Sequence, residues 1–589
     1  MPFEKLEDVA GKAFDYVVIG GGTAGLPAAV RLSDDSGVSV LLLEAGSVDN
    51  LGDFKIDVPA QFGRTLGDLK YDWAFTTAEQ SALNGRQLLW SRGKGLGGTS
   101  AMNFYCWSKP HAVDINNFEK LGNPQWNWTE YKKYSNRSEC VHLPMKEQTD
   151  LYPHTFTDDS CGKSGPLQVI IPPHLHGADM LFQETMVKIG LRAINDPYSG
   201  DITGTWIAAS NLDPKTWTRS YAATAYLLPN IDRPNLSVLT SALVSRILFN
   251  KVERGEDRSA RGVEFLAIKS PHILELSGVG RPEILSKIGV DVVVNLSGVG
   301  ENVQEHSLVG VPFELPIGEE TLESLLDPVY AAKAKELHEL GQGLHRIGIT
   351  SAAFFPLSAT KCEGVTSLID GLEAEVDAKA KAGQLRPGLE EQLRLQISVL
   401  RDDTVPDCEV ILFPGYYFPD PNVPPEKGKN YITPIACLNH PISRGTIHAE
   451  CKNPTVQPVC DPRYFESDFD MEIMLQMVKF IRGMKEIEPW KSGTVKESLP
   501  GPEYLTDDQL RDYIKKTLGT VFHTAGSCSM LPRDKGGVVD HKLKVYGTTN
   551  LRVADISIIP LHISAHTQAT AYMIGEKAAD IIKAENATC

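Results

Sequence analysis

The sequence contains no long apolar run and no apolar signal core at its N-terminus. A membrane-spanning helix needs roughly 20 consecutive apolar residues, and no stretch of the chain approaches that length. The chain starts Met-Pro-Phe-Glu-Lys-Leu-Glu-Asp, which is too polar for a secretory signal. The sequence as it stands therefore predicts a cytoplasmic protein without a membrane span. A secreted chain whose signal had been replaced by Met would look the same.

Paired cysteine motifs and a surplus of positive charge are missing as well. Ten cysteines are scattered along the chain and none forms Cys-x-x-Cys, so we expect neither a metal site nor a redox dithiol. The net charge is −17. An acidic surface of this kind argues against nucleic acid and anionic membranes as partners. A small-molecule substrate is expected, and the sequence leaves monomer and homodimer both open.

A nucleotide site is indicated near the N-terminus. Residues 14–19 read as a short buried strand, followed by G-x-G-x-x-G at Gly20, Gly22 and Gly25 and then by a helix over residues 26–32. Gly20 permits a tight turn, Gly22 lets the backbone approach a pyrophosphate, and Gly25 lets the helix pack on the strand. This order of elements predicts a Rossmann-like unit.

Two further features extend this site. A second strand over residues 38–43 ends at Glu44, which lies 19 residues past Gly25, where a carboxylate accepts hydrogen bonds from ribose hydroxyls. Residues 92–103 form a second glycine-rich loop, flanked by aromatic residues that favour burial. Its backbone can lie flat against a large planar or phosphorylated ligand.

Two histidines near the C-terminus are the candidate catalytic residues. His523 and His566 lie 43 positions apart, each in a loop of small residues, beside a predicted strand (551–554) and helix (570–583). Isolated histidines are more often core residues. Next to a hydride-accepting cofactor, however, one imidazole can take the proton of an alcohol while the other holds its oxygen.

These motifs, in this order, resemble the glucose–methanol–choline (GMC) family of FAD oxidoreductases. The resemblance runs from about residue 15 to residue 582. It includes Gly298-Val-Gly-Glu-Asn-Val-Gln-Glu-His306, Pro441-Ile-Ser-Arg-Gly445 and Asp461-Pro-Arg-Tyr-Phe465. The chain is similar to aryl-alcohol oxidase and, to a comparable degree, to fungal secondary-metabolite alcohol oxidases and dehydrogenases.

The resemblance implies roles for individual residues. The ADP half of FAD would be held by Gly20, Gly22, Thr23, Ala24, Gly25 and Glu44; the flavin and pyrophosphate by Arg92, Gly97, Gly98, Thr99 and Asn103; adenine by Val244; and the isoalloxazine would be closed over by Asp555, Ala565 and Thr567. Some family members attach the flavin to a histidine at the position of Met102, so we expect non-covalent FAD. The aromatic residues Tyr416, Phe418 and Phe522 would line the substrate site.

The expected fold is α/β with two domains, a Rossmann-like FAD-binding domain and an antiparallel-sheet substrate domain capped by helices. Residues 1–150, 236–310 and 511–589 are assigned to the FAD-binding domain. Residues 151–235 and 311–510 are assigned to the substrate domain, where helical periodicity over residues 331–344 and 372–400 predicts the cap.

The resemblance implies oxidation of a primary alcohol, aryl or allylic, to the aldehyde. His523 would take the proton and His566 would hold the oxygen. The cofactor would then be reoxidised by O₂, giving hydrogen peroxide, or by a quinone-type acceptor. Two alternatives stay open. One is a lyase or cyclase without net redox change. The other is a degenerate isoform, because only Leu266-Ala-Ile-Lys269 separates Phe265 from Ser270, where the family carries roughly 20 more residues including an interior strand.

Overall fold

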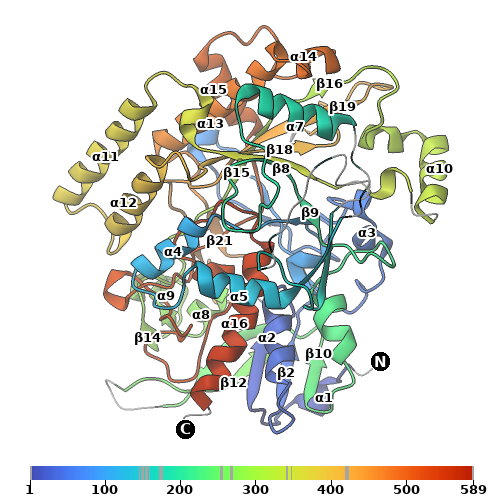
Figure 1. Ribbon diagram of the computed structural model, residues 1–589. Helices are drawn as coiled ribbons and strands as arrows, with labels where there is room; N and C mark the ends of the chain where they lie inside the picture. The colour runs from blue at the N-terminus through green and yellow to red at the C-terminus, as the bar shows by residue number, and fades with distance from the viewer. Residues whose placement is uncertain are drawn as a thin grey trace.

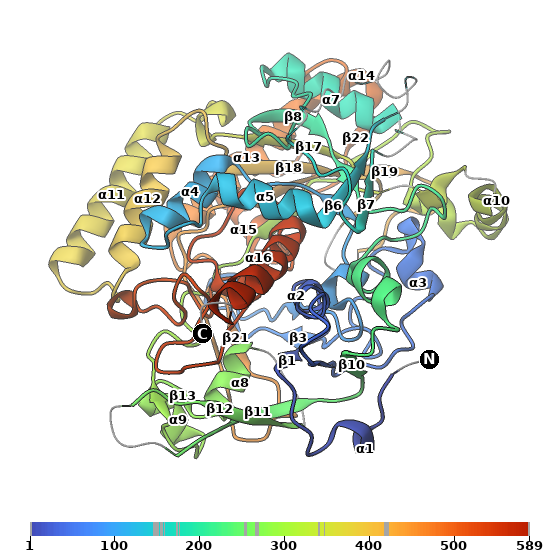
Figure 2. The same ribbon diagram turned by 60° about the horizontal axis from the view of Figure 1, so that its bottom comes forward.

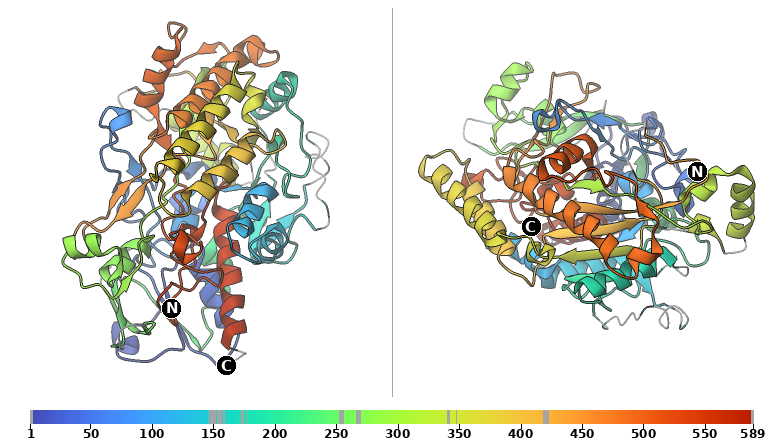
Figure 3. Two further views of the ribbon diagram at one scale, coloured as in Figure 1. Left: turned by 90° about the vertical axis from the view of Figure 1, so that its left-hand side faces the viewer. Right: turned by 90° about the horizontal axis from the view of Figure 1, so that it is seen from above.

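Two sheets organise the chain, one in the lower half of Figure 1 and one in the upper half. The computed structural model describes residues 3–144, 146, 152, 157, 159–171, 175, 177–251, 256–265, 270–339, 342–346, 348–417 and 423–586. Both termini lie at the lower end, as Figures 1 and 3 show. No helix within these ranges is both long enough and apolar enough to cross a membrane.

The lower sheet is the Rossmann-like unit. Its strands β1 (Tyr16–Ile19), β2 (Val40–Leu43) and β10 (Leu236–Leu239) are parallel, in the order β1-β2-β10. The strands are apolar on both faces because both faces are covered. One face packs against α2 (Gly25–Leu32) and α16 (Gln568–Asn586), and the other against β11 (Val244–Phe249) and α1 (Leu6–Val9).

The outer edge of β1 lies next to the segment that the sequence predicts to be shortened. Strand β12 (Ala260–Phe265) ends and α8 (Ser270–Leu276) begins on either side of residues 266–269, which are outside the described residues. In the part of the chain that the structure describes, β1 pairs only with β2, and Val17 is 40% exposed. The loss of an interior strand stays a prediction.

The upper sheet is antiparallel and forms the floor of the substrate domain. Its path runs β22 (Lys496–Glu497), β16 (Phe313–Glu314), β19 (Tyr431–Leu438), β18 (Cys408–Phe413), β17 (Ser351–Phe355) and β8 (Gly204–Ile207), with β15 (Ser307–Gly310) joining β19 to β23 (Gly519–Thr520). Alternate residues of β18 face opposite ways. Val410 packs with α13 (Asp468–Gly483) above the sheet, whereas Ile411 and Phe413 face the other side.

The helical cap is present with two changes from the sequence prediction. Helix α10 (Pro328–Glu339) replaces the predicted helix over 331–344, and the periodic stretch 372–400 is two helices, α11 (Val365–Lys381) and α12 (Leu389–Leu400). These two project as an arm at the left of Figures 1 and 2. The chain turns between them at Gly383 and Gly388, which both have positive φ.

The strand predicted at residues 551–554 is wrong. These residues bond to residues 543–545 through single antiparallel contacts and do not form a ladder. They then run directly into the turn η11 (Ile556–Ile558), which Asp555 caps. The predicted fold class is confirmed, whereas the domain boundaries remain predictions.

Candidate active site

The two glycine-rich loops pack directly on each other. The Gly97 N–H donates to the Gly21 carbonyl at 2.7 Å. A Cβ on Gly98, whose φ is +52°, would lie 2.8 Å from the Gly22 Cα, and a Cβ on Gly25 would lie 2.0 Å from the Gly20 carbonyl oxygen. Only glycine permits these approaches, so the sequence builds one backbone surface from two distant segments.

Glu44 ties this surface together. Its buried carboxylate accepts three backbone N–H groups, from Gly21 at 2.8 Å, Gly46 at 2.7 Å and Gly95 at 3.0 Å. Burial raises the pKa of this carboxyl above its usual range, and the three hydrogen bonds oppose that rise. The structure therefore gives Glu44 a role in holding the loops, and its contact with a ribose stays a prediction.

The donor set fits the expected FAD. The backbone of the first loop and the start of α2 carry the N–H groups that would bind a pyrophosphate, as in other dinucleotide sites. Asn103 connects the second loop to the C-terminal segment, because its Nδ2 donates to Gln568 Oε1 at 2.6 Å, directly after Thr567. Met102 is buried and offers no imidazole for a covalent link.

The remaining predicted cofactor residues lie around the same surface. Thr99 Oγ1 accepts the Gly93 N–H, Val244 packs with Leu43 under the sheet, and the Asp555 carboxylate accepts the Ser557 N–H. Thr23 and Ala24 lie in the first loop, and Ala565 is fully buried beside His566. Their contacts with a cofactor remain predictions.

The structure brings the two predicted catalytic histidines together. The ring centroids of His523 and His566 lie 5.0 Å apart, and the ring planes are nearly perpendicular. His566 Nε2 lies 2.8 Å from the Glu409 Oε1, and the Glu409 side chain is 1% exposed. Because Nε2–H donates to this carboxylate, Nδ1 is the ring nitrogen of His566 that remains for another partner.

His523 is fixed from three sides. Its Nδ1 lies 2.9 Å from the Nδ1 of His306, and its backbone N–H donates to Glu305 at 2.7 Å. Its carbonyl accepts the Nε2–H of His562 at 2.9 Å, because the other ring nitrogen of His562 accepts the Ile563 N–H. The Nε2 of His523 is the ring nitrogen left for a substrate.

Electrostatics keep this imidazole neutral. Burial, followed by the nearby His566, His562 and Arg92, lowers the pKa of His523 well below its usual value. Burial also lowers the pKa of His562 to about 3. Arg92 reaches the site from the second glycine loop, with its guanidinium 3.8 Å from the Glu305 carboxylate.

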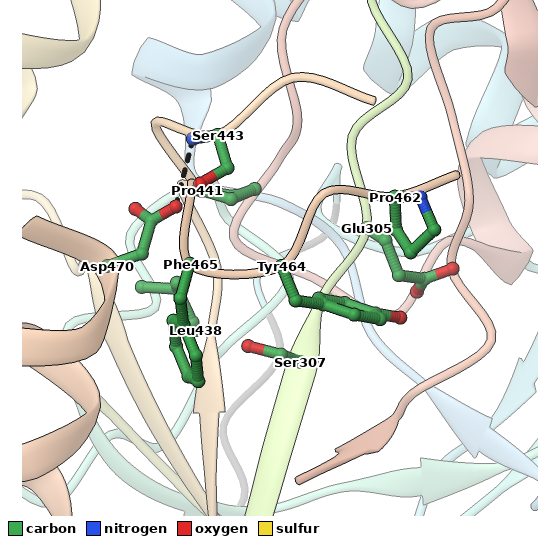
Figure 4. A pocket seen from close by; sticks show the side chains of 9 residues that line it. All are labelled: Glu305, Ser307, Leu438, Pro441, Ser443, Pro462, Tyr464, Phe465 and Asp470. Atoms are coloured by element: carbon green, nitrogen blue, oxygen red, sulfur yellow. Dashed lines mark hydrogen bonds between the residues drawn. The ribbon is translucent and has the colours of Figure 1, made fainter. Parts of the chain in front are cut away.

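Glu305 anchors the loop that carries His523, since its carboxylate also accepts the Thr524 hydroxyl. Burial raises the pKa of this carboxyl. A small cavity of about 10 Å³ adjoins it. Figure 4 shows the lining, which consists of Glu305, Ser307, Leu438, Pro441, Ser443, Pro462, Tyr464, Phe465 and Asp470.

Aromatic residues flank the histidines. Phe522, directly before His523, is half-buried and has a φ of +63°, an uncommon conformation for a bulky residue that is often found at functional sites. The Tyr416 ring packs against Tyr431, with ring centroids 5.0 Å apart, whereas the adjacent Tyr417 packs against Phe413, with ring centroids 5.6 Å apart. Phe418 lies outside the described residues.

The sequence analysis did not single out Glu409, and it named His306 only as the last residue of a family motif. Glu409 is a single acidic residue within the apolar segment Cys408-Glu-Val-Ile-Leu-Phe413, and this pattern could have indicated a functional side chain. The ring of His306 lies against His562, with centroids 3.6 Å apart. In the described ranges, no group of three or more His, Cys, Asp or Glu side chains is arranged to hold a metal ion.

Comparisons with known proteins agree with this geometry. Sequence models described as GMC oxidoreductase match residues 14–267 and 441–575. The dehydrogenase mpl7 of Monascus purpureus is 32% identical over 620 residues, covering 98% of this chain and 97% of the relative.

Two solved structures are similar along the whole chain. An FAD-dependent oxidoreductase from Chaetomium thermophilum has a TM-score of 0.87 at 26% identity, covering 98% of this chain and all of that one. A fungal aryl-alcohol oxidase has a TM-score of 0.83 at 24% identity, covering 97% and 99%, and supports the fold. The family and the oxidoreductase class predicted from the sequence are confirmed: the chain belongs to the GMC oxidoreductases.

Proposed function

We propose that the protein oxidises a primary alcohol, aryl or allylic, to the aldehyde with non-covalently bound FAD. The observation that carries this proposal is the pair of imidazoles 5.0 Å apart, joined to the second glycine loop through Arg92 and Asn103. FAD, when bound, accepts the hydride that leaves the alcohol carbon. The similarity to FAD-dependent and aryl-alcohol-oxidising proteins supports the same conclusion.

His523 takes the hydroxyl proton at Nε2. For this nitrogen to be free, the hydrogen on Nδ1 donates to the Nδ1 of His306. The lowered pKa of His523 keeps the ring neutral, and therefore able to accept a proton, throughout the neutral range.

His566 holds the alcohol oxygen. Its Nε2–H stays on Glu409, so a ring that also carries a hydrogen on Nδ1 donates from there to the alcohol oxygen, and the Glu409 carboxylate balances the charge. The apolar neighbours Ile411, Phe413 and Tyr417 favour an aromatic or allylic body over a sugar. The electron acceptor, O₂ or a quinone, is set by access to the cofactor.

An anaerobic titration tests the proposal. Purified protein with FAD is mixed with aryl alcohols, aliphatic alcohols and sugars, and bleaching of the flavin absorbance is followed. Selective bleaching by aryl or allylic alcohols supports the proposal, and the rate of recolouring in air separates oxidase from dehydrogenase. A flavin that no alcohol bleaches would contradict it and favour a lyase or cyclase.

The histidine assignment is tested by His523→Ala. Flavin reduction should slow by about 10²–10⁴-fold while FAD stays bound, because a general base is lost.

In the unaltered protein, the rate of flavin reduction should stay constant as the pH falls through 6.5 and decline only in more acidic solution, since the pKa of His523 is lowered. A decline centred near 6.5 would contradict the assignment.

A further inference from the structure

A buried arginine without an acidic partner lies at the turn η7 (Leu344–Arg346), after α10. Arg346 is 6% exposed, and its Nε and Nη1 are buried with no hydrogen-bond partner among the described residues. Its Nη2 reaches only the His338 carbonyl, at 3.4 Å. The Nδ1 atoms of His338 and His345 are buried there too, and within the described ranges they have no partner.

The described residues include no carboxylate that neutralises the charge of Arg346 in this cluster. Burial lowers the pKa of Arg346 to about 10, which leaves the guanidinium charged at neutral pH. Burial also lowers the pKa values of His338 and His345, so both rings are neutral donors or acceptors. The chain has 75 Asp and Glu residues, yet in the described part of the chain no carboxylate forms an ion pair with Arg346. A buried unpaired charge is costly, so the arrangement calls for an external anion.

The cluster faces the cofactor-binding half. Helix α10 stands beside α3 (Phe54–Asp57) in Figures 1 and 2, and η7 contacts η1 (Pro59–Gln61). The Phe54 ring packs edge-on against His345, with centroids 6.2 Å apart. The Arg346 guanidinium stacks 3.9 Å from the ring centre of Trp217.

A row of aromatic residues leads from Arg346 to the histidines. Trp217 packs in one cluster with Phe62 and Phe413. The Phe413 ring contacts Tyr417, with centroids 5.6 Å apart. A Cβ on Gly519, which is four residues before His523, would lie 3.1 Å from the Tyr417 hydroxyl oxygen.

We propose that Arg346, flanked by His338 and His345, binds a carboxylate, and that this carboxylate belongs to the alcohol substrate. The Nε–H and the neighbouring Nη2–H point the same way and match the two oxygens of one carboxylate, because Nη2 carries two hydrogens and its contact with the His338 carbonyl is long, at 3.4 Å. A single guanidinium in aromatic surroundings suits a monoanion better than a phosphate dianion. The substrate class is then an aromatic alcohol with an acid group at its far end. This inference rests on the proposed function.

Binding is tested first, without turnover. Calorimetry measures the affinities of biphenyl-4-carboxylate and of biphenyl-4-carboxamide for the unaltered protein, Arg346→Gln and Lys335→Gln. Lys335 is an exposed cation on α10, the helix that carries His338, and its variant loses the same charge. Arg346→Gln should weaken binding of the carboxylate about tenfold, or about 1.4 kcal/mol, and leave the amide unchanged. Equal affinities in all three proteins would overturn the site.

Turnover then identifies the source of the carboxylate. With 4′-(hydroxymethyl)biphenyl-4-carboxylate, Arg346→Gln should raise KM about tenfold with kcat retained, and the carboxamide analogue should show no change. Loss of acid binding without this KM change would mean that a free acid occupies the site, which overturns the substrate assignment. If no alcohol bleaches the flavin, the proposed function fails, while the calorimetry still decides whether the site exists.

The thermal stability of a variant tests whether Arg346 has a partner inside the protein. Arg346→Met removes a charge that has no internal partner, so the thermal midpoint of the cofactor-free protein should stay level or rise. A clear fall would show that Arg346 is paired within the protein, and would overturn the inference.

Discussion

At the scale of single residues, Glu409 is the least expected side chain of the site. It lies on the face of β18 that also presents Ile411 and Phe413, and its Oε2 is buried with no partner in the described chain. A carboxylate on an apolar sheet face is costly unless its charge is used. The Glu409 carboxylate accepts a hydrogen bond from His566 Nε2, which fixes the orientation of the ring. In the proposed mechanism, the carboxylate also balances the positive charge of protonated His566.

Substituting Glu409→Gln should slow flavin reduction by about 10–100-fold at saturating alcohol, with FAD affinity unchanged. The amide keeps the size of the side chain but removes the charge that stabilises protonated His566. Anaerobic stopped-flow absorbance measures the rate. Glu390→Gln, on the exposed face of α12, is the matched control. Identical reduction rates in both variants would show that the Glu409 charge plays no part.

The sequence identified His523 and His566 because local motifs surround them, and it found the glycines for the same reason. It could not identify Glu409, because that contact joins residues 157 positions apart. Nor could it assign His306 to the site, since its 2.9 Å approach to His523 depends on how β15 meets the C-terminal loop. Partners of this kind follow from the tertiary fold.

At the scale of elements, one histidine joins the two halves of the molecule. His440, two residues after β19, lies 2.9 Å from Asp114 on α4 (Ala112–Lys120) and 3.4 Å from Asp407, which precedes β18. Asp114 also accepts the Ser564 N–H at 2.8 Å, just before His566. Despite burial, these two carboxylates raise the pKa of His440 to about 10, so the ring is protonated at neutral pH.

Replacing His440→Gln should destabilise the fold by about 3 kcal/mol at pH 6, because two buried carboxylates lose their cation. A folded pKa above the unfolded value of about 6.5 gives stability that is complete below pH 6.5 and is lost as the pH rises through about 10. Urea unfolding at pH 6, 8 and 10 measures the difference. His541→Gln, outside this network, is the control. A difference that grew with pH would contradict the charged state.

Most of the few helices and strands that the sequence predicts are present, and the errors have physical causes. Residues 372–400 keep one helical pattern, yet glycines of positive φ divide them into α11 and α12. Residues 551–554 include three apolar side chains, which favoured a strand, but their neighbours at 543–545 offer too few hydrogen bonds for a ladder. Local sequence indicates which secondary structure a segment prefers, and the neighbouring segments available for pairing determine which one forms.

At the scale of the whole molecule, the C-terminal helix holds the N-terminal unit in place. Glu576 of α16 is fully buried and pairs with Arg31 of α2 at 3.0 Å and with Arg137 at 2.6 Å. The Tyr226 hydroxyl donates to the same carboxylate at 2.7 Å. The cofactor surface therefore depends on contacts between segments 350 to 545 positions apart. The outer edge of β1, in contrast, has no strand beside it among the described residues.

Because FAD would contact both glycine loops and the C-terminal segment, adding it should stabilise the whole fold. At 100 times its dissociation constant, a ligand that binds only the folded state adds about 2.7 kcal/mol. The thermal midpoint of cofactor-free protein should therefore rise as FAD is titrated, and riboflavin, which lacks the ADP half, should produce a much smaller rise.

Acid precipitation should leave all flavin in the supernatant, because Met102 offers no attachment point. Flavin in the pellet would contradict non-covalent binding, and an unchanged midpoint would favour a degenerate isoform in which the open edge of β1 has cost the protein its cofactor.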